Sequence, residues 1–266
     1  MKPVKIGIVG SGAIGSTLAK LIRKSFAKEA VISYVCDRHK EKARRLAASL
    51  GKPTICLNVE QLVKKSDLII EAASTVVAEE VTKLAWKYAK NVLVLSVGGL
   101  LKMDLPAART TKFRVWVPSG AICGIDGVLA AREAGIKTVK IVTRKPPEGL
   151  REAPYFLKRK FPILKGNQEV CLFKGNVFDA VQNFPQNVNV AAVLALAGIG
   201  PYRTQVEIWT SKTYSGNQHE VTAEGHAGKF TSIIHNIPSE LNPKTSALAI
   251  YAALATLRKM FSPVRI

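Results

Sequence analysis

The chain has 266 residues, of which 47% are hydrophobic and 22% charged, and this composition excludes a disordered or fibrous protein. Its 39 lysine and arginine residues against 19 aspartate and glutamate residues give a formal net charge of +20, which raises the question of an anionic partner. The basic residues are spread along the chain without a zinc-finger spacing or an aromatic RNA-binding motif, so no specific nucleic-acid partner is expected.

The first part of the chain alternates short apolar runs with amphipathic segments. An apolar run at 4–9 is followed by apolar residues at helical spacing from Ile14 to Phe26. Further strands are predicted at 31–36, 54–57, 68–73, 92–96 and 113–117, and further helices at 39–50 and 76–89. This alternation predicts a parallel sheet with helices on both faces.

The pattern changes after Pro118. Helices are predicted at 122–134, 178–183, 188–197 and 245–260, strands at 138–144, 170–173, 205–210, 219–224 and 230–235, and a long loop or partly helical insertion at 145–168. Because the last three strands have no long helix between them, this part is expected to form an α+β domain with an antiparallel or mixed sheet.

Residues 10–15, with the sequence GSGAIG, form a G-x-G-x-x-G pattern that follows a predicted strand and opens a predicted helix. In this setting the pattern is typical of dinucleotide binding. Gly10 permits the tight turn, Gly12 lets a pyrophosphate approach the backbone, and Gly15 lets the helix pack closely against the strand. The free N–H groups at the start of the helix, which include those of Ala13 and Ile14, would hold the anion.

Asp37 ends the second predicted strand, where a carboxylate can accept hydrogen bonds from both ribose hydroxyls and would repel a 2′-phosphate. The next residues, Arg38, His39 and Lys40, could hold that phosphate instead, so the sequence favours NAD and leaves NADP open. Two further segments follow the fourth and fifth predicted strands, where this fold places the other end of the cofactor. They supply the candidates Ala73, Ser74 and Ser96.

Nine stretches, collinear over nearly the whole chain, resemble the L-aspartate dehydrogenase family. They are GIVGSGAIGS (7–16), EAAS (71–74), SVGGL (96–100), PSGAICGIDG (118–127), TRKPP (143–147), FPQNVNVAA (184–192), LALAGIG (194–200), NQHEV (217–221) and NIPSELNPKTS (236–246). The glycine loop is shared by many enzymes, whereas the later stretches are much more specific. The chain departs from many relatives at 211–216, where they have an acidic residue and a proline.

The resemblance implies NAD(P)-dependent oxidation of L-aspartate to iminoaspartate by a homodimer, as a first step towards quinolinate and NAD. It implies a Rossmann-type dinucleotide-binding domain at 1–119, completed by a C-terminal helix within 240–266, and an α+β substrate and dimerisation domain at 120–239. By motif position, the family's catalytic histidine falls on His219 and its cofactor contacts on Ala121 and Asn189.

The residues themselves also favour His219 as the general acid and base, because imidazole titrates near neutral pH. On its predicted strand His219 shares a face with Val221 and Ala223, so exclusion of solvent could tune its pKa. Asn187 and Asn189 flank the start of an apolar helix. A side-chain amide there could orient the nicotinamide carboxamide, although Asn187 could instead cap the helix.

A dicarboxylate substrate needs cationic side chains or N–H donors. The substrate-binding candidates are Ser119, Lys229, Lys244 and His226. Ser119 and Asn242 each precede a predicted helix, whose N-terminus could bind an anion. Arg144 and Lys145 are further candidates that could equally be surface charges, and no spacing typical of a metal site is found.

Two alternatives remain open. A related two-domain reductase, of the homoserine dehydrogenase or dihydrodipicolinate reductase type, would share the first half of the chain and differ in the second. A non-catalytic dinucleotide sensor would not need the Asn-Gln-His-Glu segment at 217–220. The short apolar run at the N-terminus, the lack of a long apolar span and the four isolated cysteines predict a cytoplasmic protein without disulfides.

Overall fold

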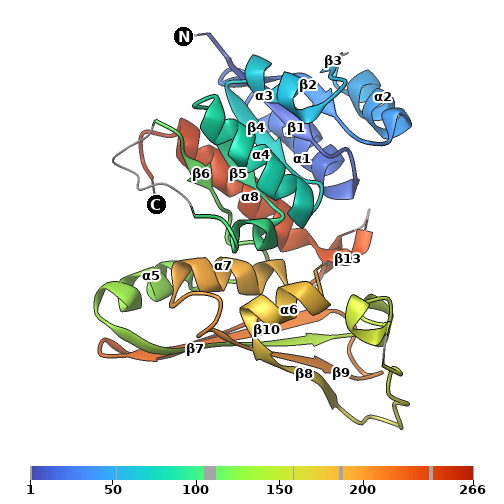
Figure 1. Cartoon of the computed structure of the whole chain (residues 1–266), viewed down its shortest axis with the longest axis vertical. Coiled ribbons are helices and arrows are strands. Elements are labelled where there is room, and N and C mark those ends of the chain that lie inside the picture. Colours follow the sequence, from blue (N-terminus) through green and yellow to red (C-terminus); the bar gives the residue numbers. More distant parts are fainter. Residues whose placement is uncertain are drawn as a thin grey trace. The chain divides into compact units, whose positions relative to one another are not determined.

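The computed structural model describes residues 2–51, 53–104, 112–157, 159–185, 188–239 and 242–265, with only the backbone of 242–244. The chain divides into two compact units. One comprises the residues up to Pro118 together with those from Ile250 onward, and the other runs from Ser119 to Ala249 (Figure 1).

The first unit is built on a six-stranded sheet in the order β3-β2-β1-β4-β5-β6, in which all neighbouring strands are parallel. The strands are β1 (Val4–Val9), β2 (Ala30–Cys36), β3 (Thr54–Ile55), β4 (Leu68–Glu71), β5 (Asn91–Val94) and β6 (Val115–Trp116). This is the strand order of the Rossmann fold, and it confirms the predicted parallel sheet. The order reverses between β1 and β4, and such sheets bind ligands outside the carboxyl ends of the strands at that point.

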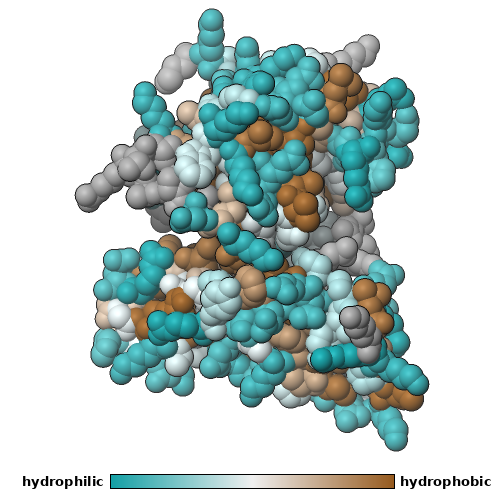
Figure 2. All heavy atoms as spheres, viewed as in Figure 1, coloured by the Kyte–Doolittle hydropathy of each residue, from teal (hydrophilic) through white to brown (hydrophobic). Residues whose placement is uncertain are grey.

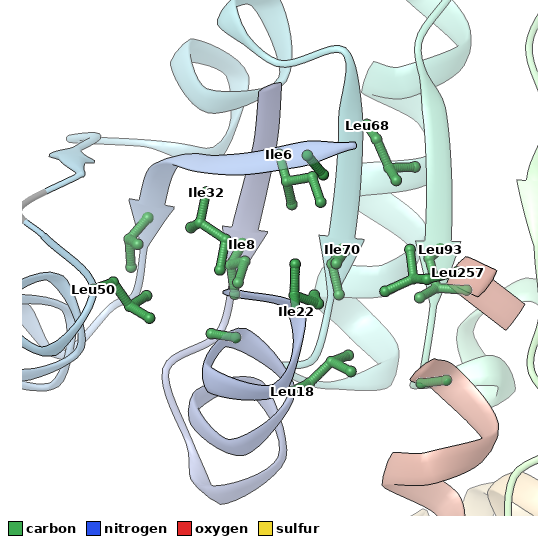
Figure 3. Close-up of a cluster of buried hydrophobic side chains, with 14 of the residues drawn as sticks. Ile6, Ile8, Leu18, Ile22, Ile32, Leu50, Leu68, Ile70, Leu93 and Leu257 are labelled. Carbon is green, nitrogen blue, oxygen red and sulfur yellow. The ribbon is translucent and has the colours of Figure 1, made fainter. Parts of the chain in front are cut away.

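Helices flank the sheet and complete the core of the first unit. They are α1 (Ala13–Ser25), α2 (Lys40–Ser49), α3 (Val59–Lys65), α4 (Thr75–Lys87), a short 3₁₀ helix η1 (Val97–Leu100) and α8 (Ala247–Phe261). Ile6 and Ile8 of β1 pack with Leu18 of α1 and Leu257 of α8 in one buried cluster (Figure 3). The last helix of the chain therefore supplies part of the first unit's core.

The second unit contains a five-stranded sheet in the order β11-β10-β7-β9-β8. The strands are β7 (Ile136–Lys145), β8 (Val170–Asn176), β9 (Gln205–Thr210), β10 (Asn217–Gly225) and β11 (Gly228–Asn236). Only the β7–β9 pair is parallel, which confirms the predicted mixed sheet. Helices α5 (Ile125–Glu133), α6 (Val177–Asn183) and α7 (Asn189–Ala197) cover one face of it (Figure 1).

Two predicted helix starts are wrong. Residues Asn242–Ser246 form the strand β13, which pairs with β12 (Pro238–Ser239), and α8 begins only at Ala247. The Asn-Pro pair resembles a helix start, but pairing with the preceding strand overrides that local preference. Ser119 does not precede a helix directly either, because α5 begins at Ile125 after Gly124, whose φ of 80° is in the left-handed region.

The insertion at 145–168 contains two short 3₁₀ helices, η3 (Pro147–Gly149) and η4 (Pro154–Phe156). Hydrophilic side chains cover much of the face seen in Figure 2 in both units. None of the helices in the described part of the chain combines the length and apolar character needed to cross a bilayer.

Candidate active site

The glycine-rich turn between β1 and α1 is shaped by close backbone approaches. The Gly10 N–H donates to the Cys36 carbonyl oxygen at 2.9 Å, and the φ of Gly10 is 100°, a conformation that favours glycine. A Cβ atom on Gly15 would lie 2.1 Å from the Gly10 oxygen. A Cβ atom on Gly12, in contrast, would meet nothing within 4 Å. Gly10 and Gly15 are thus required by the fold, whereas the space beside Gly12 is open to a ligand.

A cavity of about 460 Å³ lies beside this turn, within the first unit. Of the cofactor-binding candidates, Gly10, Gly12, Asp37, Arg38, Ala73 and Ser74 line it. Ala13, Ile14, Gly15 and Ser96 do not line it. Lining residues that the sequence did not single out include Lys42 on α2 and Asn58, the N-cap of α3. No motif marks them, because only the fold brings these helix starts to the glycine turn.

The Asp37 carboxylate follows β2 and links the glycine turn to the start of α2. Its Oδ2 accepts a hydrogen bond from the Ser11 N–H at 2.6 Å, and its Oδ1 accepts one from the His39 N–H at 2.8 Å. Asp37 therefore lies where the sequence predicted a ribose-binding carboxylate, with one backbone donor already on each oxygen.

Glu71, at the end of β4, is fully buried and joins the ends of two strands. Its Oε1 accepts from the N–H groups of Ala73 and Ser74 and from the Ser96 hydroxyl, and its Oε2 accepts from the Ser96 N–H. Burial raises the pKa of Glu71, and these donors oppose that shift. The carboxylate thus fixes the two predicted cofactor-binding turns, and the Ser96 hydroxyl is engaged by Glu71. Ser74 caps α4 by accepting from the Val77 N–H.

The second unit places His219 on β10, where it is only 2% exposed. His219 shares its buried face with Val221 and Ala223, as the strand alternation predicted. Its Nδ1 lies 3.0 Å from the Oγ1 of Thr143, the residue opposite it on β7. Burial, and secondarily the positive charge of Lys145, lowers the pKa of His219 to about 3. The imidazole is therefore neutral at physiological pH.

Lys145 is a buried cation near this histidine, although the sequence left it open as a surface charge. It ends β7 two residues after Thr143, so both side chains lie on the same face of the strand, and it is 5% exposed. Burial lowers the pKa of Lys145 to about 8. Arg144, between them, points to the other face and forms an ion pair with Glu220 at 3.0 Å. The alternation of side chains along β7 would predict that Lys145 is buried, but only if the face of the strand that packs against the core were known.

The segment that precedes α5 is held by the Asn236 side chain and lies close to the start of α7. The Asn236 Nδ2 donates to the Ala121 carbonyl oxygen at 3.0 Å, which fixes the orientation of that amide. A Cβ atom on Gly120 would lie 3.5 Å from Val190, the residue that follows Asn189 at the start of α7. The Oδ1 atoms of Asn189 and Asn236 are buried and have no hydrogen-bond partner among the described residues. The predicted cofactor contacts Ala121 and Asn189 therefore belong to one neighbourhood.

Two of the substrate candidates, Lys229 and His226, lie away from His219. Lys229 is exposed and forms an ion pair with Glu224 at 3.4 Å, near the far end of the β10–β11 hairpin. That position is five residues, or about 17 Å, along the strand from His219. His226 is exposed at the hairpin turn beside Gly135. Asn187 and the side chain of Lys244 lie outside the described parts, and the described residues contain no cluster of three metal-ligating side chains.

A Rossmann-type unit with a glycine turn beside an open cavity, joined to a mixed-sheet unit with a buried histidine and lysine, defines a two-domain dinucleotide-dependent dehydrogenase. The comparisons with known proteins agree. Residues 10–117 match a family described as the NAD binding domain of homoserine dehydrogenase, and residues 126–260 match the C-terminal domain of aspartate dehydrogenase. The second match lies in the half of the chain where the alternatives differ.

An L-aspartate dehydrogenase of Methanosarcina mazei is 41% identical over 270 residues, which cover 99% of each chain. The chain therefore belongs to the L-aspartate dehydrogenase family, as its motifs suggested. The fold is similar to a crystal structure of aspartate dehydrogenase from Thermotoga maritima, with a TM-score of 0.76, 24% identity and full coverage of both chains. It is also similar to GenD2 from gentamicin A biosynthesis in complex with NAD, with a TM-score of 0.54, 15% identity and coverage of 97% and 85%.

Proposed function

We propose that this chain oxidises L-aspartate to iminoaspartate, with NAD or NADP as the hydride acceptor. The observation that carries the proposal is the 41% identity to an L-aspartate dehydrogenase over 99% of both chains. In the second unit, the buried and neutral imidazole of His219 can act as the base. The buried cation Lys145 can pair with a carboxylate of the substrate.

The dinucleotide supplies hydride acceptance, and the protein supplies orientation. The residues of the first unit fit the group, because the space beside Gly12 is open and continues into the cavity that Asp37 and Arg38 line. Gly12 would face the pyrophosphate and Asp37 the adenosine ribose. In the second unit, the Oδ1 of Asn189 is buried without a partner among the described residues, so it is a suitable acceptor for the carboxamide of the nicotinamide. Ala121, the other cofactor contact that the resemblance implies, lies in the segment that Asn236 holds.

His219 would take the proton that the substrate's amino group must lose before the Cα hydride leaves. In the tautomer that donates from Nδ1 to the Thr143 hydroxyl, Nε2 keeps its lone pair and acts as the base. A base whose pKa is about 3 is weak, and the charge of Lys145 contributes to that value. A substrate carboxylate that pairs with Lys145 would offset this charge and raise the pKa of His219. Binding of the dicarboxylate would thereby prepare its own base.

The deciding experiment measures NADH or NADPH formation with L-aspartate, L-glutamate, L-homoserine and D-aspartate. We expect reduction with L-aspartate, and a loss of about 10²–10⁴-fold in kcat for His219→Ala, because removal of a general acid or base typically has this effect. His226→Ala, which changes an exposed histidine on the same hairpin, is the matched control and should keep its activity. Reduction specific to L-homoserine, or full activity in His219→Ala, would contradict the proposal.

We further infer that the enzyme works as a homodimer in the cytoplasm, and that its product feeds the formation of quinolinate. The five-stranded sheet supports the dimer, because α5, α6 and α7 cover one of its faces and Ile233 of β11 is 56% exposed. Light scattering on the purified protein tests this: a monomeric mass at micromolar concentration would rule out the dimer.

A further inference from the structure

We propose that Asn236 holds the amino group of the substrate, whose N–H donates a hydrogen bond to the side-chain oxygen Oδ1. This inference rests on the proposed function, because it names the residue that recognises the amine of that substrate. Asn236 is then the third residue of the substrate site, beside the base His219 and the cation Lys145.

One hydrogen bond fixes the orientation of the Asn236 amide. Its Nδ2 donates to the Ala121 carbonyl oxygen at 3.0 Å. Because a carbonyl oxygen only accepts, the amide nitrogen must face it, and Oδ1 must point away from it. Asn236 is 7% exposed, and its Oδ1 is buried without a hydrogen-bond partner among the described residues. A buried acceptor without a donor is unfavourable, so this oxygen is suited to a ligand that carries an N–H or O–H group.

Strand pairing places Asn236 on the same face of the sheet as the other two residues. Asn236 is opposite Asn217, which lies two residues before His219 on β10, and residues two apart on a strand point to the same face. Continuing the β10–β7 register by one residue places Lys145 opposite Asn217. Asn236, Asn217 and Lys145 thus form one row across three neighbouring strands, and His219 lies in the next row.

This arrangement suits a short ligand with an amine at one end and a carboxylate at the other. Neighbouring strands are about 4.8 Å apart, so Asn236 and Lys145 are about 10 Å apart across the sheet, and the His219 row lies about 7 Å along it. Asn236 also lines a cavity of about 230 Å³ at the end of the β10–β11 pair, within the second unit. A four-carbon diacid can therefore place a carboxylate at Lys145 and its amine between Asn236 and His219.

The uncharged oxygen of Asn236 fits the amine throughout the reaction. The nitrogen binds as an ammonium group, loses a proton to His219 and becomes an imine, and in each state it keeps an N–H that an oxygen can accept. A neutral amide does not raise the pKa of the amine as a carboxylate would, so it does not oppose removal of the proton. Asn189 has its own buried Oδ1 for the nicotinamide carboxamide, which leaves that of Asn236 to the substrate.

Isothermal titration calorimetry of the protein with NADH bound tests the proposal, with L-aspartate and succinate as probes. The reduced dinucleotide cannot accept a hydride, so binding is measured without turnover, and succinate is the same diacid without the amine. We expect L-aspartate to bind the unchanged protein more tightly than succinate. Asn236→Leu should weaken L-aspartate about tenfold, because a charge-assisted hydrogen bond is lost, and should change succinate by less than about twofold.

Two further variants separate this contact from a structural role. Asn236→Asp also loses the bond to Ala121 but keeps an acceptor oxygen, so its affinity for L-aspartate should stay within about threefold of that of the unchanged protein. Gln218→Met removes an amide that lines the same cavity from the opposite face of β10, and it should change both affinities by less than about twofold.

Three results would overturn the proposal. They are equal losses of L-aspartate affinity in Asn236→Asp and Asn236→Leu, an equal loss of succinate and L-aspartate affinity in Asn236→Leu, and succinate binding as tight as that of L-aspartate in the unchanged protein. The expected pattern of binding in a protein that does not oxidise L-aspartate would contradict only the proposed function.

Discussion

At the scale of single residues, the second unit contains two buried side chains, His219 and Lys145, whose pKa values are both lowered by burial. Burial disfavours the charged form of both His219 and Lys145, so it lowers both pKa values, to about 3 and about 8. At pH 7 the lysine is charged and the histidine is neutral. The pair thus offers one cation and one proton acceptor within a largely apolar sheet face.

Lys145→Met should raise the pKa of His219 and weaken the binding of L-aspartate, because it removes the positive charge near the imidazole. We expect KM for L-aspartate to rise at least about tenfold, with a smaller effect on kcat, if one charge-assisted bond to a carboxylate is lost. Histidine titration by NMR and steady-state kinetics would measure the two effects. Arg144→Met, on the opposite face of β7, should change neither, and an unchanged KM in Lys145→Met would refute this role.

Residue chemistry was partly predictable. His219, Asp37 and the glycine loop have local signals, namely a motif or a position at the end of a predicted strand. Lys145 lies in the stretch TRKPP and is a candidate, but the sequence does not distinguish it from a surface charge, because a lysine is ordinarily exposed. Only the pairing of β7 with β10 and β9 shows that it points to the buried face.

At the scale of structural elements, two glycines of the β1–α1 turn have different roles: Gly15 is required for packing, and Gly12 leaves space for the ligand. Gly15→Ala should destabilise the protein by about 2 kcal/mol, because its Cβ atom would collide with a backbone oxygen. Gly12→Ala meets open space at an ordinary φ of −70°, so stability should change by less than about 1 kcal/mol. Its methyl group would nevertheless obstruct the pyrophosphate and lower dinucleotide affinity about tenfold or more.

Urea denaturation and dinucleotide titration of both variants measure these effects. Equal loss of stability in the two variants would show that the open space beside Gly12 has another use than ligand binding. A dinucleotide affinity of Gly12→Ala equal to that of the unchanged protein would lead to the same conclusion.

The ends of β4 and β5 depend on one carboxylate. Glu71→Ala should lower the free energy of unfolding by about 3 kcal/mol or more, because it leaves the buried N–H and hydroxyl of Ser96, and two partly buried N–H groups, without their acceptor. Glu79→Ala is the control: Glu79 is on α4 and forms an exposed ion pair with Lys83, so its removal should change stability by less than about 1 kcal/mol. Thermal or urea unfolding of the two variants compares them directly, and equal losses would argue against the role given to Glu71.

Elements with strong periodicity were predictable, and short or irregular ones were not. The apolar run of β1 and the alternation in β10 are long enough to define strand and face. The Asn-Pro pair at 242–243 predicts a helix start, but residues 242–246 form a strand, because Asn-Pro is a local signal whereas the pairing with β12 depends on a neighbouring strand. The segment before α5 turns at Gly120 and Gly124, both with positive φ, and this shortens the predicted helix.

At the scale of the whole molecule, the net charge of +20 fits the ligands of a dehydrogenase. The dinucleotide and the dicarboxylate are both anions, and a basic protein attracts both. Many of the basic residues are solvent-facing side chains of helices such as α2, where Arg44 pairs with Glu41. The charge distribution is therefore compatible with a dehydrogenase of anionic ligands.

Stability should depend on pH through His219. Its pKa is about 3 in the folded protein and about 6.5 in the unfolded chain, so below pH 6.5 the unfolded chain binds the proton first. The free energy of unfolding should then fall by up to about 1.4 kcal/mol per pH unit as the pH decreases from 6.5 towards 3. Urea unfolding at pH 7 and pH 5 should show a loss about 2 kcal/mol larger for the unchanged protein than for His219→Gln. Equal losses would show that His219 is not buried in its neutral form.

The position of α8 affects how the chain can mature during synthesis. Ile250, Ala253 and Leu257 belong to the same buried cluster as the first strand and helix, yet the ribosome makes them only after the whole second unit. The nascent nucleotide-binding unit therefore leaves this part of its core unfilled until α8 has been synthesised. Synthesis of α8, rather than completion of the first 118 residues, is the step at which this unit can close its core.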